Sequence, residues 1–296
     1  MRAQAINRRN FVALASTAVA AQAGSSMAAA QTNAPKKGRF KQSIFRTVLD
    51  PKMPLEEVCR HCAEIGIQGI DMVAVEDWPT LKKYGLTPAM GPAAAGSFRD
   101  GIIRPELHNE LEKSIGEAID VCAEHGCPNI TAVGGQRRGM SYEQGADNAV
   151  ALLNRVKGHA EDKGVNLCLE VMNSKYKDPA FGREDQICDH LAWAMGVLKR
   201  VNSPRVKLLL SMYHIQIMDG DLCANIRENF PWIAHFDTGG VPGRHEIDDT
   251  QEINYRFVAK TIADLGYTGF VCHEYRPSPG SNPVQTLAKV FEIMNV

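Results

Sequence analysis

Short apolar runs alternate with amphipathic segments along most of this chain. Short apolar runs bounded by turn residues are typical of strands buried in a sheet, and amphipathic segments of 3.6-residue period are typical of helices. The apolar runs predict eight strands, at residues 42–46, 67–73, 85–90, 129–134, 165–171, 206–211, 232–237 and 269–275. The amphipathic segments predict eight helices, at residues 54–65, 77–84, 105–125, 142–163, 185–201, 220–229, 251–265 and 281–294.

The order of these elements predicts the fold class. Several helices end in a glycine just before the next strand, as in AEIGIQG, EDKGVNL and ADLGYTG, which is a common helix stop. Eight βα units in one continuous stretch predict an α/β protein with a single (β/α)8 TIM barrel. A doubly wound sheet is the alternative, but no G-x-G-x-x-G sequence follows the first strand to bind a dinucleotide.

The N-terminal segment differs from the rest of the chain. Arg8 and Arg9 precede a weakly apolar, alanine-rich stretch that ends in a small-residue run at residues 27–30. This pattern predicts a twin-arginine signal peptide at residues 1–30, followed by a linker at 31–39 and the barrel at 40–296. The apolar stretch is too short and too poor in leucine for a membrane-spanning helix, so we expect a periplasmic protein without stable membrane insertion.

The net charge of the chain bears on which kinds of molecule it can bind. The whole chain has a formal net charge of −1, and cleavage after Ala30 leaves 30 basic and 34 acidic residues, a charge of −4. A mildly acidic protein lacks the basic face that nucleic acid or an anionic membrane surface requires. We therefore expect a small-molecule substrate and no nucleic acid; the sequence is also compatible with a homo-oligomer.

The cysteines do not predict a disulfide framework. Most of the eight lie scattered inside apolar periodic segments, which is typical of buried free thiols. These are Cys59, Cys62, Cys122, Cys168, Cys188 and Cys272. Cys59 and Cys62 form a lone C-x-x-C pair in the middle of a predicted helix, and no second pair completes a zinc site.

Polar side chains gather at the carboxyl ends of the later predicted strands, where a TIM barrel builds its active site. They are Glu170 and Asn173 after the fifth strand; Ser211, Tyr213, His214 and Gln216 after the sixth; His235 and Asp237 on the seventh; and His273, Glu274 and Tyr275 on the eighth. Strands alternate their faces with a period of two, so Glu170 and Glu274 can both point into the barrel.

Three carboxylates at one barrel mouth predict a metal site. Glu170, Asp237 and Glu274 would repel one another strongly without a cation, because buried carboxylates are costly unless paired or coordinated. An oxygen-rich cluster suits Mn²⁺ or Mg²⁺, and Zn²⁺ is also compatible. The alternative is that each carboxylate caps a helix or pairs with an arginine.

Four motifs in the second half resemble the hydroxypyruvate isomerase family of the xylose-isomerase-like TIM barrels, relatives of the ketose 3-epimerases. They are LCLEVMN, YHIQIMDGD, VPGRHEIDDTQEINY and GYTGFVCHEYRP; in the first half, KQSIFR and GIQGIDMV agree in general character only. The resemblance implies a divalent metal held by four strand-end side chains. Two of these, carried over as Glu170 and Glu274, are glutamates that also move the substrate's proton.

The resemblance also implies roles for residues around these glutamates. The metal ligands would be Glu170, Ser211, Asp237 and Glu274. Substrate contacts would come from Asn173, His214, Arg244 and His245, while Glu246 would position the loop that carries Arg244. For His214 a satisfied core histidine is an equal alternative.

Two positions depart from the family pattern, and both are metal-ligand positions. Ser211 stands where the family usually has aspartate, and Asp237 stands where it has glutamine or histidine. One anionic ligand is lost at Ser211 and one is gained at Asp237. The exchange therefore either transfers the carboxylate ligand from the sixth strand to the seventh or weakens metal binding.

The expected activity is isomerisation or epimerisation of a small hydroxy-carbonyl compound, such as hydroxypyruvate or a keto-sugar, by glutamate-mediated proton transfer through an enediolate. Two alternatives stay open. One is a non-catalytic or metal-impaired periplasmic sugar-binding barrel. The other is an endonuclease-type barrel, which would need more histidine ligands and a basic face.

Overall fold

The computed structural model describes residues 38–175 and 184–296 and contains eight parallel strands. The strands are β1 (Lys41–Phe45), β2 (Gly69–Asp71), β3 (Thr87–Met90), β4 (Asn129–Val133), β5 (Asn166–Glu170), β6 (Val206–Ser211), β7 (Ile233–Thr238) and β8 (Phe270–His273). They pair in the order β3-β2-β1-β8-β7-β6-β5-β4. The sheet is thus a nearly closed barrel, and the predicted single (β/α)8 TIM barrel is confirmed.

The segment that follows β3 completes the barrel, because β3 and β4 form no regular ladder. The Gly91 amide donates to the Asn129 carbonyl at 2.8 Å, and the Val133 amide donates to the Ala95 carbonyl at 3.3 Å. The Ile102 amide then bonds the Val133 carbonyl at 3.0 Å. We call residues 91–102 the seam segment; it lies beside β4 as an irregular strand would.

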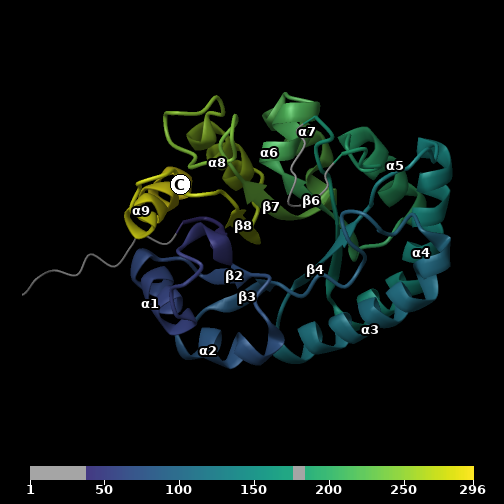
Figure 1. Cartoon of the computed structure of the whole chain (residues 1–296), viewed down its shortest axis with the longest axis horizontal. Coiled ribbons are helices and arrows are strands. Elements are labelled where there is room, and N and C mark those ends of the chain that lie inside the picture. The colour runs from purple at the N-terminus through teal and green to yellow at the C-terminus, as the bar shows by residue number, and fades with distance from the viewer. Residues whose placement is uncertain (1–37, 176–183) are drawn as a thin grey trace, which may run out of the picture. The chain divides into compact units, whose positions relative to one another are not determined.

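Nine α-helices are present in the described part of the chain, and Figure 1 shows helices α1 to α5 lying outside the strands. They are α1 (Leu55–Ile65), α2 (Trp78–Lys83), α3 (His108–His125), α4 (Tyr142–Lys163), α5 (Leu191–Val201), α6 (Met212–Met218), α7 (Leu222–Asn229), α8 (Tyr255–Asp264) and α9 (Pro283–Met294). The glycine stops are confirmed: Gly66 and Gly164 end α1 and α4 with φ of 106° and 73°, a left-handed conformation that favours glycine.

Two helix predictions need correction, and one helix was not predicted. The helix predicted at 185–201 begins only at Leu191. The backbone before it bonds other segments instead of forming a helical turn: the Ile187 amide donates to the Gly135 carbonyl, and the Cys188 carbonyl accepts from the Met172 amide. The helix predicted at 251–265 begins at Tyr255, where the Asn254 side chain caps it by accepting from the Phe257 amide. The sequence also missed α6, which follows β6 without a break.

The hydrophobic core lies mainly between the strands and the helices. Alternate strand residues such as Ile44, Ile70 and Leu167 are buried there against helical side chains. A separate small apolar cluster contains Met90, Cys168 and Leu209. The core between strands and helices supplies most of the buried apolar contacts. The strand ends at the barrel mouth can therefore carry polar groups.

The predicted free thiols are confirmed, since all eight cysteines are free and seven are buried. Burial raises the pKa of Cys59 to about 11 and raises that of Cys62 further, so the C-x-x-C pair stays in the thiol form. No helix in residues 38–175 or 184–296 is long and apolar enough to cross a membrane. The predicted signal peptide and most of the predicted linker fall in residues 1–37, outside the described residues.

Candidate active site at the barrel mouth

A cavity of about 580 Å³ opens at the carboxyl ends of the strands, where TIM-barrel active sites lie. We call it the mouth cavity. Its polar lining includes Asp71, Thr131, Glu170, Asp237, Arg244 and Glu274, and its apolar lining includes Phe45, Met72, Met90, Phe98 and Leu209. A largely apolar cavity with a few convergent charged groups is typical of a small-molecule site.

Three carboxylates meet in this cavity, as the strand pattern predicted. Glu170 ends β5, Asp237 lies near the end of β7, and Glu274 directly follows β8. One carboxylate oxygen from each lies within 4.8 Å of the others, while Glu170 and Asp237 are buried and Glu274 is half-buried. This cluster could hold a metal ion.

The three carboxylates repel one another, and Arg244 offsets part of this repulsion. Burial, together with the like charge of Glu274, raises the pKa of Asp237 from 3.8 to about 6. Arg244 relieves part of the repulsion, because its Nη2 forms an ion pair with the Glu274 carboxylate and its Nε donates to the Glu274 carbonyl at 3.3 Å. The guanidinium also lies 5.1 Å from the centre of the Tyr213 ring, a cation–π contact.

The loop between β7 and α8 fixes the position of Arg244, which has a left-handed φ of 57°. The Arg244 amide donates to the Gly240 carbonyl at 2.8 Å, and its own carbonyl accepts from the Arg276 amide at 2.7 Å. His245 does not line the cavity; its Nδ1 lies 2.9 Å from the Arg276 carbonyl oxygen. Glu246 accepts from the Ser278 amide at 2.9 Å and from its hydroxyl at 2.6 Å, which fastens this loop to the segment after β8.

Asn173 and His214 form a buried pair that lies outside the cavity lining. The Asn173 amide donates to Nδ1 of His214 at 3.1 Å, so Nδ1 is the acceptor and the ring proton lies on Nε2. The Asn173 side-chain nitrogen lies 2.7 Å from the same atom. Both residues are therefore placed to support the end of β5 against α6.

Ser211, the predicted ligand from β6, is fully buried and its Cα pairs with that of Asp237. Its hydroxyl oxygen has no hydrogen-bond partner among the described residues. A buried hydroxyl usually has a partner, so this one, next to Asp237 in the sheet, fits a role as an additional oxygen ligand for an ion. An all-oxygen donor set of this kind fits a hard divalent ion such as Mn²⁺ or Mg²⁺.

The structure adds Asp71, which sequence reasoning did not place in the site, and gives contacts to His235, which was named at the end of the seventh strand without a role. Asp71, at the end of β2, has a carboxylate oxygen 2.8 Å from Nε2 of His235, which in turn lies 3.4 Å from a carboxylate oxygen of Asp237. Burial alone lowers the pKa of His235, but the two carboxylates outweigh it and raise the pKa to about 10. A carboxylate inside the apolar run GIQGIDMV was the available signal for Asp71.

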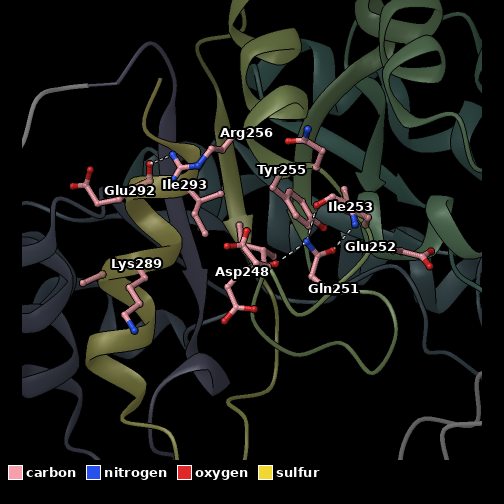
Figure 2. A pocket seen from close by; sticks show the side chains of 13 residues that line it. Asp248, Gln251, Glu252, Ile253, Tyr255, Arg256, Lys289, Glu292 and Ile293 are labelled. Atoms are coloured by element: carbon pink, nitrogen blue, oxygen red, sulfur yellow. Dashed lines mark hydrogen bonds between the residues drawn. The ribbon is translucent and has the colours of Figure 1, made fainter.

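A larger hollow of about 800 Å³ lies elsewhere and does not contain this chemistry. Figure 2 shows that its lining comes from residues 247–256 and from α9, including Asp248, Glu252, Arg256 and Lys289. None of the three mouth carboxylates is among its lining residues. The smaller mouth cavity is therefore the candidate active site.

Comparison with known proteins defines the class of the chain. A sequence model of the xylose isomerase-like TIM barrel family matches residues 59–294. The chain therefore belongs to this family, as its four motifs predicted.

Individual relatives narrow the comparison. The putative hydroxypyruvate isomerase of Danio rerio is 29% identical over 210 residues, which is 71% of each chain. The 2-oxo-tetronate isomerase of Cupriavidus necator is 27% identical over 212 residues, 68% of this chain and 77% of the other.

Solved structures of low identity share the fold. An AP endonuclease of family 2 from Brucella melitensis has a TM-score of 0.71 and 24% identity, covering 82% of this chain and 96% of that one. D-psicose 3-epimerase from Clostridium cellulolyticum, with D-tagatose, has a TM-score of 0.68 and 17% identity, covering 86% and 98%. The IolI protein with a binding zinc atom has a TM-score of 0.67 and 15% identity, with the same two coverages.

Proposed function

We propose that the chain is a metal-dependent isomerase or epimerase of a small hydroxy-carbonyl compound. The convergence of Glu170, Asp237 and Glu274 in the mouth cavity carries this proposal. The names of the relatives, hydroxypyruvate isomerase and 2-oxo-tetronate isomerase, support the same reaction class. We also propose that the mature protein acts in the periplasm, on the basis of its twin-arginine sequence.

The two glutamates are the proton-transfer groups of this proposal. They come from β5 and from the end of β8, so they approach the cavity from different sides of the second half-barrel. One carboxylate removes the proton from the carbon beside the carbonyl, and the other returns a proton to the neighbouring carbon or to the opposite face. A divalent ion held by Glu170, Asp237, Glu274 and Ser211 would polarise the carbonyl and the adjacent hydroxyl of the substrate.

Arg244 favours a substrate that carries a carboxylate. Its guanidinium lines the mouth cavity and presents five donors, of which those on Nη2 and Nε contact Glu274. A planar guanidinium binds a carboxylate through two parallel hydrogen bonds, which fixes the orientation of a short acid. Phe45, Met90 and Leu209 add apolar surface to the lining of the same cavity.

Solvent-deuterium exchange tests the reaction class directly. The metal-loaded chain is incubated in D₂O with hydroxypyruvate or 2-oxo-tetronate, and mass spectrometry measures deuterium in substrate and product. We expect incorporation at the carbon beside the carbonyl. A chain that binds metal and these acids or a keto-sugar without any exchange would instead be a sugar-binding barrel.

A different observation bears on the endonuclease alternative. Among the described residues, His235 is the single histidine in the two candidate metal clusters, whereas a phosphodiester-cleaving barrel of this type would need several. The similarity to the Brucella melitensis AP endonuclease is at an identity that shows the fold only. Incubation with abasic DNA provides the check, and we expect no cleavage.

A further inference from the structure

We propose that the barrel interior holds a second cation site of the zinc type, formed by Asp71, His235, Asp237 and Cys272. We call these four residues the interior cluster. One ligand atom from each lies within 4.8 Å of the others, and all four residues are buried. Only Asp237 belongs to both this cluster and the carboxylate cluster of the mouth.

Adjacent strands bring the four side chains together. They lie on β2, β7 and β8; in the strand order β2-β1-β8-β7, β2 and β8 flank β1, and β7 lies next to β8. Cys272 pairs in register with Asp237 on one side and with Ser43 of β1 on the other. The cluster is therefore set by the ladder of the barrel itself, which gives the rigid support that a metal site needs.

Orphaned polar atoms give a second, independent reason for an ion. Among the described residues, Oδ1 of Asp71 and Nδ1 of His235 are buried without a hydrogen-bond partner, while Nε2 of His235 contacts the carboxylates of Asp71 and Asp237 without hydrogen-bond geometry. The 2.8 Å contact between Asp71 and His235 is thus a close approach of charged groups rather than a well-directed hydrogen bond. Buried polar atoms without partners are rare, and a bound ion is one of their recognised explanations.

The donor types distinguish the interior cluster from the mouth. Imidazole nitrogen, thiolate sulfur and two carboxylates form a four-ligand set of mixed softness, which suits tetrahedral Zn²⁺. The mouth offers oxygen only and suits a harder ion.

The mouth cavity provides an entry path. Asp71 and Asp237 line this cavity, so an ion can reach the interior cluster from solvent through the mouth. On the side of the cluster away from Asp237, Cys272 pairs with Ser43 of β1, whose hydroxyl is also buried without a hydrogen-bond partner among the described residues.

Cobalt titration tests the proposal without reference to activity. The full chain is stripped with a chelator and loaded with Co²⁺, and elemental analysis follows removal of free metal. We expect two ions per chain and a near-ultraviolet thiolate-to-cobalt charge-transfer band. One ion per chain and no such band would overturn the second site, leaving His235 as a buried imidazolium between two aspartates.

Matched variants assign each ion. Cys272→Ser should remove the band and reduce binding to one ion, while Cys168→Ser, which changes another fully buried barrel thiol, should keep both ions and the band. The double variant Glu170→Gln with Glu274→Gln should lose the mouth ion and keep the band. A band that survives Cys272→Ser, or that disappears with the two glutamates, contradicts the assignment.

One measurement needs no variant and so does not depend on folding of Cys272→Ser. X-ray absorption at the zinc edge of the natural chain, loaded with two Zn²⁺, should show sulfur in the first coordination shell. A shell of nitrogen and oxygen alone would exclude Cys272 as a ligand. Neither result depends on whether the mouth catalyses isomerisation, so the two proposals can fail separately.

Discussion

Replacing Glu274 with glutamine separates the proposed proton-transfer role from a purely structural one. The change keeps the size of the side chain and removes its charge. At saturating metal we expect the exchange rate to fall by about 10²–10⁴-fold, which is the usual contribution of a positioned acid or base. Glu170→Gln should fall by a similar factor, because both carboxylates are needed for the two halves of one transfer.

The structure predicts a much smaller effect of Glu274→Gln on stability. Breaking a buried ion pair costs about 3–5 kcal/mol when the partner charge is left uncompensated. Arg244 is not left alone, because Glu170 and Asp237 still attract it, and Glu274 is 19% exposed. We therefore expect a loss of about 1 kcal/mol, which lowers Tm by about 2–4 °C in a chain of this size.

The assay compares deuterium incorporation with thermal unfolding for each variant. Glu252→Gln is the matched control, because Glu252 is exposed, lies outside the mouth cavity and contacts Gln216 at 3.2 Å. We expect this control to keep both its exchange rate and its Tm. If Glu170→Gln and Glu274→Gln both retain full exchange activity, the assignment of the proton-transfer pair is wrong.

Three further predictions concern the metal shell, the loop and export. Asp237→Ala should release the mouth ion in calorimetric titration, whereas Ser211→Ala should change its affinity little because a neutral hydroxyl is a weak ligand; the reverse ranking would refute the carboxylate exchange. Although burial opposes it, the hydrogen bonds that Glu246 accepts lower its pKa below 4.5, so its contribution to stability is present above pH 4.5 and is lost as the pH falls through the lowered value. Glu246→Gln should therefore lose less stability than the natural chain in acid, as followed by circular dichroism. Replacing Arg8 and Arg9 with lysine should trap the protein in the cytosol, and unchanged cell fractionation would contradict the export prediction.

The barrel was predictable because its signals are local. Each buried strand is a compact apolar run, and glycines such as Gly66 and Gly164 mark helix ends in the sequence itself. The rule that TIM-barrel sites form at strand ends then located Glu170, Asp237 and Glu274 without any alignment. These predictions needed only the order of the elements.

The features of the site that the sequence did not predict depend on contacts between segments far apart in the chain. Asp71 and His235 meet because β2 and β7 are brought together around the ring, which no local pattern records. His214 and His245 were predicted to contact the substrate, but both lie outside the cavity lining. The reason for His214 is that α6 starts directly after β6 and directs the ring toward Asn173; its predicted role stays untested.

The seam segment has a consequence for how this family can diversify. Residues 96–98 of this segment and Ala93 form one wall of the mouth cavity, yet the segment contacts β4 through isolated bonds rather than a regular ladder. Side chains of this wall, at Ala93, Ser97 and Phe98, can change without altering the strand pairs that carry Glu170, Asp237 and Glu274, whereas Gly96 cannot, because a Cβ there would lie 2.6 Å from the Cα of Gly101. The wall formed by these three side chains can therefore change its shape separately from the strand ends that carry the three carboxylates.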